Sequence, residues 1–147
     1  MSAFRKLSDS VWANPQIGEA EIAQAAEEGF TLIVNNRPDG EEPGQPEGGS
    51  IAAAAEAAGM RYVAIPVDHS GFSQQQVTAM AEALDGLGES DKALAYCRSG
   101  TRSTFLWALA RSRAKDDPEA LAAAAAEAGY DLSSIRPMMD MLAARED

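Results

Sequence analysis

Short apolar runs alternate along the chain with stretches in which apolar residues recur every three or four positions. The first pattern is typical of strands buried in a parallel sheet, and the second is typical of amphipathic helices. Glycines and prolines punctuate the boundaries, and Ser73 is placed to cap a helix that runs to about Leu87. The predicted strands are Leu7 to Ala13, Phe30 to Val34, Arg61 to Ile65 and Ala93 to Tyr96; the other predicted helices are Glu19 to Glu28, Ile51 to Ala58, Thr104 to Ala114, Pro118 to Ala128 and Ser133 to Ala144.

This alternation predicts an α/β fold with three layers, in which a mostly parallel central sheet is flanked by helices on both faces. With 147 residues, 46% of them hydrophobic, the chain suits one domain spanning residues 1–147. Ligands of such sheets bind at the carboxyl ends of the strands. The segment Asn35 to Ser50, rich in Pro, Gly and Glu, is longer than a simple connection needs, which is typical of a functional loop.

Charge and composition limit the kinds of molecule that this chain is expected to bind. The chain has 12 Lys and Arg against 23 Asp and Glu, a formal charge of −11, so it repels nucleic acid and acidic membranes as a whole. A small anionic substrate must therefore be held by a local cradle. We find no apolar run of membrane-spanning length and no signal-like start, and one cysteine forms no internal disulfide, so we expect a cytoplasmic protein. One cysteine and one histidine are too few for a zinc cluster, and we expect no metal or cofactor.

The only cysteine, Cys97, stands between a predicted strand and a predicted helix. There the amides of a tight loop converge with a helix N-terminus, which favours anions, and the nearby Arg98 and Arg102 favour a thiolate. A lone cysteine is often only a small buried apolar residue. The run Arg-Ser-Gly-Thr-Arg-Ser that follows Cys97 is a poor core sequence, so we expect a nucleophile.

The neighbours of Cys97 are the expected anion cradle. Arg102 has the bidentate guanidinium that suits phosphoryl oxygens, and Ser103 either hydrogen-bonds the thiolate or caps the helix. From the facing loop, Asn36 and Arg37, with Asp39, are candidates to line the cleft, although Pro-Asp-Gly is also a turn signature. The expected substrate-binding residues of the cradle are Arg98, Ser99, Gly100, Thr101 and Ser103.

Three stretches, Asn35 to Glu41, Ile65 to Asp68 and Tyr96 to Ser103, resemble the DUF442 family, the phosphatase-like domain of beta-lactamase hydrolase-like proteins. That family is similar in fold to dual-specificity protein tyrosine phosphatases. The resemblance implies that Cys97 attacks phosphorus, Arg102 grips the phosphoryl oxygens and Asp68 protonates the leaving oxygen. Asp68 also fits a simple turn, and the adjacent His69 is either a further catalytic candidate or an exposed side chain.

Two departures from the phosphatase pattern keep other functions open. Tyr96 stands where those enzymes usually carry His, and Cys97 and Arg102 enclose four residues rather than five. The shorter loop resembles that of rhodanese-type sulfurtransferases, which carry a persulfide on the cysteine and take a sulfane-sulfur donor. We favour hydrolysis of a phosphate ester, since Asp68 supplies the proton that a leaving oxygen needs and that sulfur transfer does not. A non-catalytic module that binds a phospho-ligand or a protein partner is the third interpretation.

Overall fold

A five-stranded sheet forms the centre of the structure, a computed structural model that describes residues 4–68 and 70–145. The strand order is β1-β2-β5-β3-β4, and β1 is antiparallel to β2 while the other pairs are parallel. The predicted mostly parallel α/β sheet is therefore confirmed. The strands are β1 (Arg5–Lys6), β2 (Val11–Asn14), β3 (Leu32–Asn35), β4 (Arg61–Ala64) and β5 (Ala93–Tyr96).

The register of the sheet brings several strand ends together at one edge. Tyr96, the last residue of β5, is aligned with Asn14 at the end of β2 and with Asn35 at the end of β3. All residues of β3 and β5 are buried, as expected for central strands covered on both faces, whereas the two residues of β1 are exposed. The segments that follow β2, β3 and β5 consequently leave the sheet side by side.

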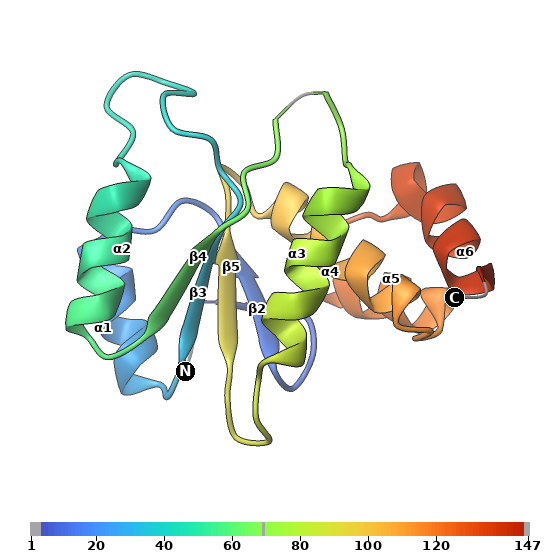
Figure 1. Ribbon diagram of the computed structural model, residues 1–147, viewed down its shortest axis with the longest axis horizontal. Helices are drawn as coiled ribbons and strands as arrows, with labels where there is room; N and C mark the ends of the chain where they lie inside the picture. The colour runs from blue at the N-terminus through green and yellow to red at the C-terminus, as the bar shows by residue number, and fades with distance from the viewer. Residues whose placement is uncertain (1–3, 69, 146–147) are drawn as a thin grey trace.

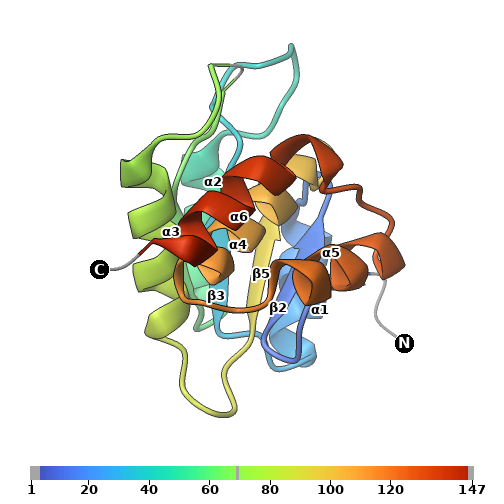
Figure 2. The same cartoon turned by 90° about the vertical axis from the view of Figure 1, so that its right-hand side faces the viewer.

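Helices cover both faces of the sheet, as predicted (Figure 1). One face is covered by α1 and α2, and the other by α3 and α4, with α5 and α6 packed on α4 farther from the sheet (Figure 2). Two apolar clusters of buried residues correspond to these two faces. The helices are α1 (Glu19–Glu27), α2 (Gly48–Ala57), α3 (Gln74–Asp85), α4 (Thr101–Arg113), α5 (Pro118–Glu127) and α6 (Arg136–Ala144).

The first predicted strand is wrong in extent. Only its end forms β2, because the Ser8 hydroxyl accepts hydrogen bonds from the amides of Ser10 and Val11 (3.3 and 3.1 Å) and turns the chain. Residues before that turn form β1. The last predicted helix is also divided, since a 3₁₀ turn at Ser133–Ile135 precedes α6, which has a proline in its first turn.

Two helices begin three residues earlier than predicted. Gly100, with φ of +91°, starts α4 at Thr101, so Arg102 lies in the first helical turn. The Asp39 side chain accepts a hydrogen bond from the amide of Gly48 (2.8 Å), which satisfies an otherwise unpaired amide at the start of α2. The cap of α3 is as predicted, because the Ser73 hydroxyl accepts a hydrogen bond from the amide of Gln76 (3.2 Å).

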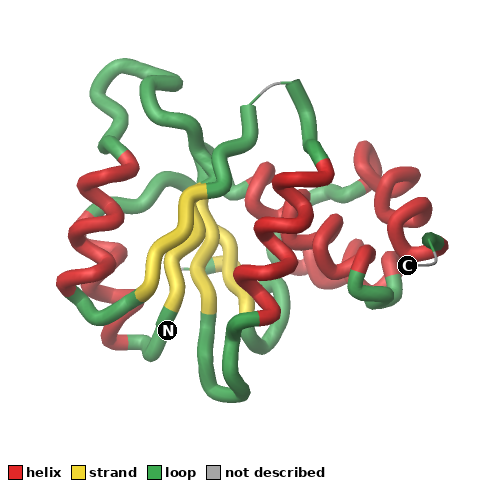
Figure 3. The backbone as a smooth tube through the Cα atoms, in the orientation of Figure 1, coloured by secondary structure: helices red, strands yellow, loops and turns green. Residues whose placement is uncertain are grey.

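Two long connections rise above the carboxyl edge of the sheet (Figure 3). One joins β3 to α2 and the other joins β4 to α3. Both stand over the edge at which β5 ends (Figure 1). No helix among the described residues is both long and apolar enough to span a bilayer.

Candidate active site

Cys97 lies at the floor of the loop that joins β5 to α4, and its side chain is fully buried. Its Sγ accepts a hydrogen bond from the amide of Gly100 at 3.1 Å. A Cβ on Gly100 would lie 2.1 Å from the Tyr130 hydroxyl oxygen, and the φ of +91° disfavours any side chain there. The loop is therefore closed tightly around the sulfur, and glycine is required for the closure.

Arg102 projects from the first turn of α4 and binds both long connections. Its Nη1 donates to Glu41 Oε2 (2.7 Å) and to the carbonyl of Val67 (2.5 Å), and its Nη2 donates to Glu41 Oε1 (2.9 Å). The hydrogen bonds to Glu41 are the largest cause of the raised pKa of Arg102, and the nearby Cys97 side chain raises it further. Arg102 is thus the point at which the two connections meet the Cys97 loop.

The carboxylate of Glu41 lies between two arginines. It accepts hydrogen bonds from Arg102 and also from Nε of Arg37 (2.9 Å). These contacts lower the pKa of Glu41 to about 2, and the hydrogen bond from Arg102 makes the largest contribution. The side chain is only 16% exposed, so a permanent negative charge occupies a sheltered place beside the loop.

Arg37 is buried behind this carboxylate. Besides Glu41, its guanidinium donates to Gln16 Oε1 (3.0 Å) and Glu42 Oε1 (2.8 Å). Burial disfavours its charge, but the hydrogen bonds to Glu42 and Glu41 outweigh that effect and raise the pKa of Arg37 above its ordinary value. Because its three nitrogen atoms all donate hydrogen bonds, Arg37 holds in place the connection between β3 and α2, on which Glu41 and Glu42 lie.

Asn36 and Asp39 lie on the same connection but bind backbone. Asn36 Nδ2 donates to the carbonyl of Ile65 (3.0 Å), and the amide of Asn36 donates to the carbonyl of Tyr96 (2.8 Å). Asn36 thereby joins the ends of β4 and β5, while Asp39 starts α2. Both side chains shape the edge of the sheet around Cys97.

Asp68 immediately follows Val67, whose carbonyl binds Arg102. It is exposed, and its Oδ1 accepts hydrogen bonds from the amide and the hydroxyl of Ser70 (2.9 and 2.6 Å). The turn expected at Asp68 is present, and it begins one residue after Val67 along the chain. His69, the other candidate on this segment, lies outside the described residues.

Of the remaining loop residues, Arg98, Ser99 and Thr101 form a rim that is exposed or partly exposed, whereas Ser103 is buried. Arg98 is 68% exposed, with Nη2 3.6 Å from Glu42 Oε2, and the Ser99 hydroxyl donates to Thr101 Oγ1 (2.9 Å). Ser103 is fully buried, and its hydroxyl has no hydrogen-bond partner among residues 4–68 and 70–145. The contact expected between Ser103 and a ligand stays a prediction.

Four side chains that contact the predicted site residues were missed in the sequence: Glu41, Glu42, Gln16 and Tyr130. Glu41 carried a usable signal, because it is a carboxylate on the long connection after β3, the strand next to β5. Gln16 and Tyr130 carried none that we recognise. Tyr130, whose hydroxyl donates to the carbonyl of Ser99 (3.0 Å), follows a different helix and is brought to the loop only by the packing of α5 on α4.

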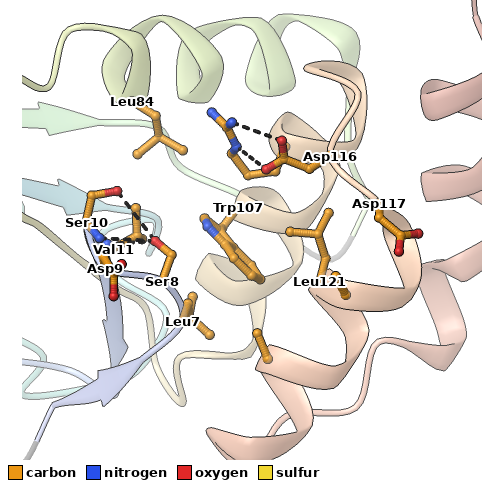
Figure 4. A pocket seen from close by; sticks show the side chains of 13 residues that line it. Leu7, Ser8, Asp9, Ser10, Val11, Leu84, Trp107, Asp116, Asp117 and Leu121 are labelled. Carbon is orange, nitrogen blue, oxygen red and sulfur yellow. Dashed lines mark hydrogen bonds and ion pairs between the residues drawn. The ribbon is translucent and has the colours of Figure 1, made fainter.

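A separate pocket lies between the turn before β2 and helices α4 and α5 (Figure 4). Trp107 forms its wall, and the ion pair of Arg111 with Asp116 (2.8 Å) closes one side. Its lining includes no residue of the Cys97 loop. Within the described part of the chain, no group of three or more His, Cys, Asp and Glu side chains is arranged to hold a metal ion.

Comparison with known proteins agrees with this geometry. The family described as "Beta-lactamase hydrolase-like protein, phosphatase-like domain" matches residues 3–114. The chain belongs to this family. A beta-lactamase hydrolase-like protein of Xylella fastidiosa (strain Temecula1 / ATCC 700964) is 36% identical over 116 residues, which cover 76% of this chain and 26% of the relative. The chain thus spans about a quarter of the length of that member of the phosphatase-like family.

Solved structures extend the likeness to the whole fold. A presumed phosphatase from Neisseria meningitidis Z2491 superposes with a TM-score of 0.82 at 29% identity, covering 97% of this chain and 99% of the other. Tk-PTP in its active form gives a TM-score of 0.75 at 20% identity, with 98% of both chains covered. The phosphatase-like domain therefore has the protein tyrosine phosphatase-like fold that the sequence predicted.

Proposed function

We propose that this domain is a cysteine-dependent phosphatase that hydrolyses a small phosphate monoester. One observation carries the proposal: the Cys97 sulfur, the Gly100 amide bound to it and the Arg102 guanidinium converge at the junction of β5 and α4. An anion above the sulfur would meet loop amides and the positive end of the α4 dipole. Positioning and electrostatic stabilisation are the main requirements of phosphoryl transfer.

In the first step the Cys97 thiolate attacks phosphorus, forming an S–P bond as the P–O bond to the alcohol breaks. Asp68 donates its proton to the leaving oxygen, which departs as a neutral alcohol. The exposed turn that follows Val67 supports this role for Asp68, because it sits one residue from the Arg102 contact. The enzyme then carries a phosphoryl group on sulfur.

In the second step water attacks that phosphoryl group. The Asp68 carboxylate takes a proton from the water, the new O–P bond forms and the P–S bond breaks. Inorganic phosphate leaves, and the thiolate is restored. Ser103, buried in the first turn of α4, would hydrogen-bond the departing thiolate. The rim residues Arg98, Ser99 and Thr101 would contact the substrate outside the loop.

Arg102 has the donors that this reaction needs. Three of its five N–H groups are used by Glu41 and Val67. The other two, on Nε and Nη2, form one edge of the guanidinium, which suits two phosphoryl oxygens in a bidentate arrangement. Glu41 would orient this edge, and Arg37 would in turn hold Glu41. We assign Glu41 and Arg37 positioning roles.

Sulfur transfer is the second candidate, and the loop length favours it. Only four residues separate Cys97 from Arg102, so the loop offers one amide fewer than a phosphatase loop to a tetrahedral phosphoryl group. A single sulfane sulfur needs less room. In that reaction the Cys97 thiolate takes the outer sulfur from a donor such as thiosulfate, which leaves as sulfite, and a thiophilic acceptor then removes it.

Parallel assays separate these functions. We expect the protein to hydrolyse an aryl phosphate, and we expect Cys97→Ser to abolish the hydrolysis while the protein remains folded. Incubation with thiosulfate and cyanide, with mass spectrometry of the intact chain, tests the second candidate. An added sulfur on Cys97 without phosphate release would replace the phosphatase with a sulfurtransferase. If neither reaction occurs, both enzymatic functions are rejected, and a non-catalytic binding module is the interpretation that remains.

A further inference from the structure

One peptide unit of the Cys97 loop is held from both sides. The amide of the Ser99–Gly100 peptide donates to Cys97 Sγ at 3.1 Å, and its carbonyl accepts a hydrogen bond from the Tyr130 hydroxyl at 3.0 Å. The N–H and C=O of a trans peptide point in opposite directions. The hydrogen bond that holds the Ser99 carbonyl toward Tyr130 therefore also directs the Gly100 N–H toward the sulfur.

The end of α5 explains how Tyr130 reaches the loop. Gly129 has a φ of +97°, and its amide donates to the carbonyl of Ala126 while the amide of Tyr130 donates to that of Ala125 (3.0 and 2.8 Å). This pair of hydrogen bonds is a Schellman motif, which ends the helix and reverses the chain. Tyr130 is consequently held in a defined place, outside residues 3–114 that the family description covers.

The surroundings of Tyr130 keep its hydroxyl a donor. The residue is 6% exposed, and the Arg5 guanidinium lies 5.1 Å from the centre of its ring. Burial is the largest cause of its raised pKa, and the Cys97 charge acts in the same direction while Arg5 acts against it. The phenol consequently stays protonated at neutral pH. Gly100 leaves room for this hydroxyl beside the loop, since a Cβ there would collide with it.

We propose that Tyr130 is a positioning residue of the catalytic loop, whose hydroxyl keeps the Gly100 amide directed at Cys97 Sγ. This inference rests on the proposed role of Cys97 as the nucleophile. Without the Tyr130 hydrogen bond the Ser99–Gly100 peptide is free to rotate, and the thiolate loses a donor. The loss affects the reactivity of the sulfur more than the binding of an anion, because Arg102 and the other amides of the loop are unchanged.

Tyr130→Phe tests the proposal, since it removes the hydroxyl and keeps the ring. We expect kcat with an aryl phosphate to fall roughly tenfold while KM changes less than about twofold. The pH at which iodoacetamide alkylates Cys97 at half its maximal rate should rise by roughly one unit. The amide proton of Gly100 should shift in a ¹⁵N-resolved NMR spectrum. Tyr62→Phe is the matched control, because the Tyr62 hydroxyl also has a hydrogen-bond partner, Asn35 Nδ2 (2.9 Å).

An alkylation profile and a Gly100 amide signal that match those of the wild type would overturn the proposal. These two readouts do not depend on phosphate hydrolysis. If they shift but the wild type hydrolyses no phosphate ester, the positioning role stands and the proposed function fails. Tyr130→Met provides a second variant without the hydroxyl should Tyr130→Phe not fold. If neither variant folds, the hydroxyl serves the stability of the whole domain and the proposal is rejected.

Discussion

Glu41 and Arg102 are joined by two parallel hydrogen bonds of 2.7 and 2.9 Å across 61 positions of the chain. This fork joins the connection after β3 to the helix that begins at the Cys97 loop. It places a negative charge beside a site that we propose for an anion. The pair therefore orients Arg102 at some cost to anion affinity.

Replacement of Glu41 by Gln should separate these two effects. With the charge removed, inorganic phosphate should inhibit about tenfold more strongly, because repulsion of one to a few kcal/mol is usual for charges a few ångströms apart near a protein surface. The rate constant kcat should fall about tenfold, since Arg102 is oriented less well. Steady-state kinetics with phosphate as inhibitor measure both quantities. Glu56→Gln, on the exposed side of α2, is the control, and equal effects of the two variants would remove Glu41 from the site.

Acid should weaken the fold through the same residue. The pKa of Glu41 falls from 4.5 to about 2 on folding, so its contribution to stability is complete above the higher value and is lost as pH falls toward the lower one. Between pH 6 and pH 3 the free energy of unfolding should fall by about 2 kcal/mol more in the wild type than in Glu41→Gln. Urea unfolding at the two pH values checks this, and parallel curves would contradict it.

Arg37→Lys should destabilise the protein strongly. The lysine ammonium cannot reproduce three contacts made by a planar guanidinium whose side chain is only 2% exposed, and the sheltered Glu41 carboxylate loses one of its two arginine partners. We expect a loss of about 2–3 kcal/mol in urea unfolding. Arg136→Lys provides the comparison, because Arg136 pairs with Asp140 and Glu119 at 34% exposure, where solvent weakens ion pairs, and its loss of stability should be much smaller. Similar losses at both positions would show that Arg37 has no special role.

Gly100→Ala should be far more harmful than Gly59→Ala. Both glycines have positive φ, +91° and +85°, but a Cβ on Gly59 meets nothing within 4 Å. The backbone strain should cost about 1–2 kcal/mol at each position, and the collision with Tyr130 should add roughly 1–3 kcal/mol at Gly100 alone. Thermal unfolding measures the difference. Aryl phosphate hydrolysis should be lost only in Gly100→Ala, and retention of activity there would show that the loop tolerates a wider shape.

Asp68→Asn should slow hydrolysis in proportion to the difficulty of the leaving group. Alkyl phosphates, whose alcohols need a proton, should lose roughly 100-fold in kcat/KM, whereas activated aryl phosphates should lose little. A series of aryl phosphates with leaving groups of different acidity supplies the measurement. Uniform slowing across the series would contradict the role of Asp68 as a general acid and leave it a structural role in the turn.

Local patterns predicted most of the fold. The apolar run of β5 and the turn residues around α3 indicate these elements directly, and the alternation of strands and helices indicates the layers. Predictions failed where a single residue redirected the backbone. The Ser8 hydroxyl ended one predicted strand early, and the positive φ of Gly100 moved the start of α4 into the Cys97 loop.

The site was predictable only as far as it lies on contiguous sequence. Cys97 and Arg102 stand in one short motif between a strand and a helix, so their neighbourhood follows from the order of residues. Glu41 was overlooked because its partner is decided by which strands are neighbours in the sheet. Tyr130 depends on the packing of α5 against α4, which no local pattern encodes.

The helix that begins at the Cys97 loop is enclosed on all sides. α4 packs against β2 and β5 on one side and against α3, α5 and α6 on the others, and most of its residues are buried. Amide hydrogens inside such a helix exchange with solvent only when the whole protein unfolds. The floor of the site therefore persists as long as the fold itself.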